Sequence, residues 1–70
     1  MDKFIIFEDD NAIVNLGEIS HAYVDEHYDD DGTWVFYMIM KNGKILELFY
    51  DTKTDAVKDL KKLFNNLNIN

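Results

Sequence analysis

The sequence predicts an α+β fold in which an antiparallel β-meander of three to four strands packs on one C-terminal α-helix. Short β-prone runs fill the stretch from about residue 3 to about residue 50. An Asn-Gly pair between two apolar runs indicates a hairpin within that stretch. From about residue 53 to about residue 67, apolar side chains recur at helical spacing. With 70 residues in total, we expect a single domain spanning residues 1–70.

The first two strands are expected on either side of an acidic turn. Residues 3–8 form a β-prone run, and residues 12–16 can return as a second strand. Asp9, Asp10 and Asn11 lie between them, and these side chains favour turns because they bond their own backbone. The meander therefore has four strands, or three with a preceding turn.

The next two strands are predicted from period-two alternation and from a strong turn signal. Residues 19–28 alternate, with His21, Tyr23 and Asp25 on one face and Ala22 and Val24 on the other. Residues 29–32, Asp-Asp-Asp-Gly, indicate a turn. Residues 33–40 are β-branched and aromatic, which is typical of a strand.

The pair Asn42-Gly43 predicts a two-residue type I′ turn, because both residues tolerate positive φ. Counting outward from that turn pairs residue 39 with 46, 37 with 48 and 35 with 50. One face of this hairpin then holds Val35, Tyr37, Ile39, Leu46, Leu48 and Tyr50. The other holds Trp34, Phe36, Met38, Met40, Ile45 and Phe49, interrupted by Glu47.

A helix is expected over about residues 53–67. Thr52 is its predicted N-cap, with Asp55 in the position of the acidic partner of a capping box. Its apolar stripe is Ala56, Val57, Leu60, Leu63, Phe64 and Leu67. One helix covers one face of a small sheet, so the second apolar face needs a curled sheet or a partner. This predicts a homodimer interface formed by Trp34, Phe36, Met38, Met40, Ile45 and Phe49.

The charge is strongly acidic and unevenly distributed. Acidic residues number 14 and basic residues 7, for a net charge of −7. Residues 1–40 hold ten acids and one lysine, whereas residues 41–70 hold four acids and six lysines. Direct binding of nucleic-acid phosphates needs clustered basic residues and is not expected. We expect instead a patch that binds a protein with a basic surface, formed by Glu8, Asp9, Asp10, Asp25, Glu26, Asp29, Asp30 and Asp31.

Metal and cofactor sites receive little support. Asp29, Asp31 and Gly32 match three positions of a calcium-binding EF-hand loop, but His27 and Met38 then occupy its first and last ligand positions. We therefore expect no metal site and no cofactor, and retain weak binding of divalent cations only as an alternative function. His21 and His27 lie about 20 Å apart along an extended strand and cannot share a zinc ion.

An enzymatic function is not expected. The chain has no cysteine, which excludes a thiol nucleophile. Ser20 and His21 are adjacent in a strand, and side chains at adjacent strand positions point to opposite faces. The fold is also too small to enclose a substrate pocket of several hundred Å³. The start of the chain does not resemble a signal peptide, and the longest apolar run, residues 34–40, is too short to span a membrane. We expect a cytoplasmic protein with no membrane partner.

Three segments of the second half give the chain a resemblance to a group of very small bacterial and phage proteins of unassigned function. They are Trp34-Val35-Phe36-Tyr37, Lys41-Asn42-Gly43-Lys44, and Phe49 to Thr52 leading into the helix. These proteins look like a short antiparallel sheet with an Asn-Gly hairpin and a C-terminal helix. Small acidic phage proteins of this kind are similar in charge and size to inhibitors of host defence. The resemblance implies such an inhibitor, whose carboxylates imitate DNA phosphates; the alternative is a structural or regulatory homodimer.

Overall fold

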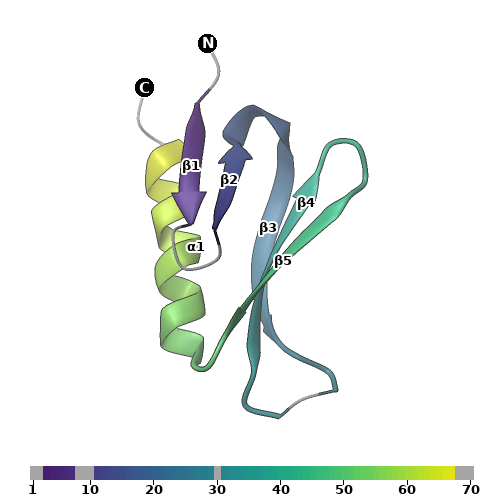
Figure 1. Cartoon of the computed structure of the whole chain (residues 1–70), viewed down its shortest axis with the longest axis vertical. Coiled ribbons are helices and arrows are strands. Elements are labelled where there is room, and N and C mark those ends of the chain that lie inside the picture. The colour runs from purple at the N-terminus through teal and green to yellow at the C-terminus, as the bar shows by residue number, and fades with distance from the viewer. Residues whose placement is uncertain (1–2, 8–10, 30, 68–70) are drawn as a thin grey trace.

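The computed structural model describes residues 3–7, 11–29 and 31–67 (Figure 1). Two short strands, a 3₁₀ turn, three longer strands and one helix follow one another in the chain. They are β1 (Phe4–Phe7), β2 (Ala12–Asn15), η2 (Leu16–Glu18), β3 (Ile19–Glu26), β4 (Trp34–Met40), β5 (Ile45–Tyr50) and α1 (Lys53–Leu67). This arrangement confirms the predicted α+β class, and the helix has the predicted bounds.

The strands form two antiparallel sheets. β3, β4 and β5 make a three-stranded meander with β4 in the centre, whereas β1 and β2 pair only with each other. The first two predicted strands thus form a separate hairpin. The hairpin and α1 lie on the same side of the meander (Figure 1), and all three meet in one apolar cluster. One face of the meander therefore packs against the hairpin and α1, and no described element lies on the other face, although Val35 on that face is also buried.

The core forms where the hairpin, the meander and the helix meet. Ile5 and Phe7 of β1 point inward and are buried, whereas Phe4 and Ile6 between them are exposed. The ring of Phe7 meets the ring of Phe36 edge-on, with centroids 5.7 Å apart. This aromatic geometry is favourable because the ring edge is positive and the ring face negative. The cluster comprises Ile5, Phe7, Val14, Leu16, Phe36, Met38, Leu48 and Leu63.

The helix is fixed at its start by the predicted cap and along its length by contacts to the meander. The Asp55 backbone N–H donates to Thr52 Oγ1 at 3.2 Å, which confirms Thr52 as the capping side chain. The Tyr50 hydroxyl donates to Asp59 Oδ2 at 2.6 Å and joins the end of β5 to α1. Leu63 is buried in the core cluster, so the helix closes the inner side of the meander.

The hairpin between β4 and β5 has a different turn from the predicted one. The Gly43 N–H donates to the Met40 carbonyl at 2.9 Å, and the Met40 N–H donates to the Lys44 carbonyl at 2.8 Å. Gly43 has φ of +90°, but Asn42 does not have the positive φ that a type I′ turn requires. The loop therefore has three residues, with glycine alone in the left-handed conformation.

That extra loop residue shifts the predicted register of β5 by one. Phe36 pairs with Leu48, and Tyr37 with Glu47, instead of Phe36 with Phe49 and Tyr37 with Leu48. A one-residue slip exchanges the two faces of a strand. The predicted division of the hairpin into two faces is therefore wrong. The face toward the helix, here called the inner face, combines Trp34, Phe36, Met38 and Met40 with Leu46, Leu48 and Tyr50.

β3 has the predicted alternation except at its start. Ala22 and Val24 pack against the core, whereas His21, Tyr23 and Asp25 are exposed. An irregularity in the pairing between Ile19 and His21 breaks the alternation there. Because of it, Ile19 also packs against the core instead of sharing the face of His21.

Candidate functional site

The described members of the predicted acidic patch lie at one end of the meander. Glu8, Asp9, Asp10 and Asp30 lie outside the described residues. Asp25, Glu26, Asp29 and Asp31 are exposed at the end of β3 and in the loop to β4. The structure therefore places half of the predicted patch in one region and does not test the other half.

Two of these carboxylates also stabilise the loop between β3 and β4. The Glu26 backbone N–H donates to Asp25 Oδ1 at 2.8 Å. The Gly32 N–H donates to Glu26 Oε2 at 3.4 Å. Asp29 and Asp31 make no side-chain hydrogen bond within the described part of the chain. Their charges are therefore free to face solvent or a partner.

The uncovered side of the meander, here called the outer face, is built of three rows that cross the strands. The register places His21 beside Ile39 and Ile45 in the first row, and Tyr23 beside Tyr37 and Glu47 in the second. Asp25, Val35 and Phe49 form the third row. No helix among the described residues covers this face, because α1 lies on the opposite side of the sheet (Figure 1).

Aromatic rings stack across the middle of the outer face. Tyr23 and Tyr37 are nearly parallel, with centroids 4.8 Å apart. The His21 ring continues the stack at 6.5 Å from Tyr23. Near the acidic loop, the rings of His27 and Phe49 lie 5.8 Å apart. Tyr23 is 45% exposed and Phe49 is 53% exposed, so the outer face presents aromatic surface to solvent.

The electrostatics of the outer face are negative. This face carries the carboxylates of Asp25 and Glu47, and β3, β4 and β5 contain no lysine or arginine. Burial raises the pKa of the Tyr37 hydroxyl above its ordinary value of 10.0, and the negative charges of Glu47 and Asp25 raise it further. Carboxylates beside phenol rings form a surface suited to cations, because both groups attract positive charge.

The predicted dimer interface does not form one surface. Phe36 and Met38 are completely buried in the core, and Trp34 and Met40 are half-buried on the same inner face. Only Ile45 and Phe49 of the predicted set lie on the outer face. The prediction took the face of β4 that packs on the helix for the uncovered face, and it placed β5 one residue out of register.

Sequence reasoning missed the row formed by Tyr23, Tyr37 and Glu47. The alternation of β3 correctly indicated that Tyr23 shares a face with His21 and Asp25. Tyr37 joins that face through the pairing of β3 with β4, and Glu47 joins it only because the hairpin loop has three residues. A helpful signal was available, because Asn-Gly is also compatible with a type I turn followed by a left-handed glycine.

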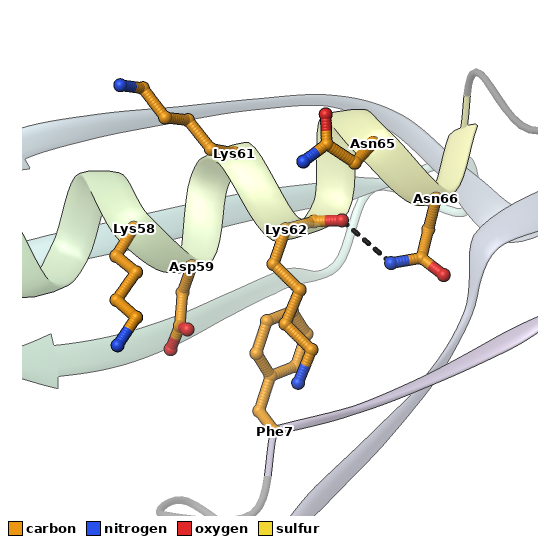
Figure 2. Close-up of a pocket in the computed structure, with 7 residues that line it drawn as sticks. All are labelled: Phe7, Lys58, Asp59, Lys61, Lys62, Asn65 and Asn66. Carbon is orange, nitrogen blue, oxygen red and sulfur yellow. Dashed lines mark hydrogen bonds between the residues drawn. The ribbon is translucent and has the colours of Figure 1, made fainter.

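A groove of about 600 Å³ lies away from the outer face, between α1 and the β1–β2 hairpin (Figure 2). Lys62 Nζ donates to the Ile6 carbonyl at 2.9 Å and lies 5.7 Å from the centre of the Phe7 ring. Lys61 points to the opposite side of the helix from Lys62 (Figure 2). The lysines therefore do not converge on one point, and Lys62 serves to fasten the hairpin to the helix.

The described residues contain no group of three or more acidic, histidine or cysteine side chains placed to hold a metal ion. Ser20 and His21 are closer than their positions in the sequence predicted, since Ser20 Oγ lies 3.4 Å from His21 Nδ1. The irregularity at the start of β3 explains this correction. Within the described residues, no carboxylate is hydrogen-bonded to the other ring nitrogen of His21, so nothing orients this ring as a base.

The chain matches no known protein family, no curated protein and no solved structure. The resemblance to small bacterial and phage proteins stays a prediction. Among the described residues, no helix combines the length and apolar character needed to cross a membrane.

Proposed function

We propose that this protein is a non-enzymatic module that binds a basic surface of another protein. The segregation of charge is the observation that supports the proposal. The outer face and the loop beside it carry acidic side chains and no described lysine. The described lysines lie at residue 3, in the β4–β5 turn and in the helix, where Asp55 and Asp59 accompany them. Complementary charge accelerates the encounter with a basic partner and suppresses wrong partners.

The class of partner that we propose is a protein that itself binds nucleic acid. Such proteins present lysine and arginine side chains spaced to meet phosphates. The carboxylates of Asp25, Asp29 and Asp31 can form ion pairs with those lysine and arginine side chains in place of phosphates. Binding would then block the nucleic acid, so the protein acts as an inhibitor. A host-defence factor is the partner that the charge and size of the chain favour.

The proposal is tested with three immobilised baits in a bacterial lysate: the natural chain, the variant Asp29→Asn with Asp31→Asn, and a control. The control is Glu18→Gln with Asp55→Asn, which removes the same charge away from the acidic loop. We expect a protein retained by the natural and control baits and released by salt, because salt screens exposed charges. Association of that purified protein should slow by about tenfold in the loop variant at low salt.

Two outcomes would contradict the proposal. One is equal retention by the loop variant and the natural chain. The other is a retained protein that neither responds to salt nor loses nucleic-acid binding when the module is added. Circular dichroism of each bait establishes that the substitutions leave the fold intact.

The second candidate function is a homodimer that covers the outer face. Exposed apolar side chains favour it, since Ile45 is 59% exposed and Phe49 is 53% exposed on a face that no element of residues 3–7, 11–29 and 31–67 covers. Sedimentation at increasing protein concentration tests it. A monomer at tens of micromolar ends this candidate, whereas a dimer broken by Phe49→Ala would support it.

A further inference from the structure

β5 borders the meander, and its outward backbone groups have no hydrogen-bond partner among the described residues. The Met40 N–H donates to the Lys44 carbonyl, which sets the alternation of the ladder. Even-numbered residues of β5 therefore direct their N–H and C=O groups at β4. The backbone groups of Ile45, Glu47 and Phe49 point the other way, away from β4.

A groove runs beside this free edge. Its volume is about 290 Å³, and its walls include Ile13 and Val14 from β2 and Ile45 and Leu46 from β5. Met40 of β4 also lines it, so the groove extends from the inner face of the meander to the edge at Ile45 and Leu46. There is space beside the first residues of β5 for side chains of an additional strand.

The rows of the outer face end at the same edge. Glu47 is the outermost residue of the row that begins with the stacked rings of Tyr23 and Tyr37. Ile45 and Phe49 end the rows on either side of it and are apolar. A strand added here would continue each row, so its side chains would meet an apolar, an acidic and an apolar residue in turn.

We propose that an extended segment of a protein partner adds antiparallel to the free edge of β5. Its pattern would be apolar, any residue, basic, any residue, apolar, with the basic residue beside Glu47. This inference rests on the proposed function and specifies how the basic partner is recognised. Backbone hydrogen bonds supply affinity in such complexes, and alternate side chains supply specificity.

A second copy of the chain fits this edge poorly. Antiparallel pairing of two β5 strands that satisfies all the outward groups places Glu47 opposite Glu47 of the second copy. Like charges directly opposite each other destabilise a sheet. β5 also contains no lysine or arginine that could pair with Glu47 in a shifted register. Charge complementarity therefore favours a basic segment over a second copy.

The test uses the full chain and a synthetic peptide, acetyl-Ser-Thr-Val-Thr-Arg-Thr-Val-Thr-Ser-amide. Its arginine and valines carry the proposed pattern. We expect binding with a Kd below about 1 mM in an amide NMR titration, with the largest shifts at residues 45–49. Replacing Glu47 with Gln should weaken binding about two- to fivefold, as expected for an exposed charge pair. The matched control Glu18→Gln should bind as the natural chain does.

Two N-methylated peptides separate strand addition from simple charge attraction. Methylation at the arginine and both valines removes the N–H groups that face β5, and should weaken binding at least about tenfold. Methylation at the inner threonines removes N–H groups that point away and should be tolerated. These peptides keep the protein unchanged, so no variant has to fold for the test to be decisive.

The outcomes distinguish this inference from the proposed function. Equal affinity of all three peptides overturns strand addition but leaves charge-driven docking intact. Absence of binding by any peptide, with a salt-sensitive basic partner still captured, also overturns strand addition; Glu47 then serves to protect the edge from pairing. Binding of the peptide without any salt-sensitive partner contradicts the proposed function alone.

Discussion

The two faces of the meander are made from alternate residues of the same three strands, yet they differ in almost every physical respect. The inner face contains Phe36 and Met38, which are completely buried beneath the helix and the β1–β2 hairpin. The outer face contains Tyr23, Tyr37 and Glu47, which no other element in the described part of the chain covers. The difference indicates that the inner face provides stability, whereas the outer face is available for interaction.

Truncation of one aromatic residue on each face should give the largest contrast. Phe36→Ala is expected to lower the free energy of unfolding by about 3–5 kcal/mol, because it leaves a cavity in the core. That loss is comparable to the whole stability of a domain of this size, so the variant should be largely unfolded. Phe49→Ala should cost less than about 1 kcal/mol because its ring is half exposed. Urea unfolding followed by circular dichroism measures the free energy of unfolding of both variants. Similar losses would contradict the difference in stability contribution between the two faces.

A double-mutant cycle should show which residues share a face. Phe36 lies beside Leu48 in the structure, whereas a two-residue turn would place it beside Phe49. Combining Phe36→Leu with Leu48→Ala should reveal a coupling of about 1 kcal/mol. The pair Phe36→Leu and Phe49→Ala should be additive within about 0.5 kcal/mol. Coupling of Phe36 with Phe49 instead of Leu48 would indicate that the hairpin has a two-residue turn.

The β1–β2 hairpin should be held less firmly against the helix when Lys62 loses its amino group. Lys62→Met keeps the aliphatic stem but removes the hydrogen bond to the Ile6 carbonyl and the charge over the Phe7 ring. We expect a loss of about 1 kcal/mol and faster hydrogen exchange in β1 and β2. Lys61→Met is the control, since Lys61 points away from the hairpin (Figure 2). Equal effects would mean that Lys62 does not hold the hairpin in place.

The smallest expected effect is on the outer face, where a substitution should change the pKa of Tyr37. Burial and the charges of Glu47 and Asp25 raise the pKa of this hydroxyl in the folded chain above 10.0. The unfolded chain then releases its proton first, so stability should fall as pH rises above about 10. Glu47→Gln should lower the pKa of Tyr37, as followed by NMR of its ring, whereas Glu18→Gln should not. If the pKa of Tyr37 were unchanged in Glu47→Gln, the charge of Glu47 would not act on Tyr37, and this prediction would be wrong.

Local signals predicted most of the elements of the fold. Thr52 and Asp55 identified the start of the helix because the cap depends only on neighbouring residues. The position of the β4–β5 turn was also predictable, but its type was not. Asn-Gly fits two hairpin loops, and the choice between them depends on how β5 packs against the rest of the chain.

The surface was harder to predict than the elements that form it. A single extra residue in the hairpin loop exchanged the faces of β5 and moved Glu47 beside Tyr37. The acidic residues of the β3–β4 loop were apparent from composition, because they follow one another in the chain. The aromatic row is assembled from three strands, and only the correct register brings its members together.

The hydrogen bond from Lys62 to the Ile6 carbonyl joins two distant parts of the chain, and this affects the order in which the protein folds during synthesis. The hairpin is made first, but the helix that covers Ile5 and Phe7 is encoded near residue 60. At about 5–20 residues per second, several seconds separate the two on the ribosome. During that interval the chain supplies Phe36 to pack against Phe7, but Leu63 is still missing from the core cluster. The core of this protein therefore closes only once the segment that forms the helix is available to pack against the inner face.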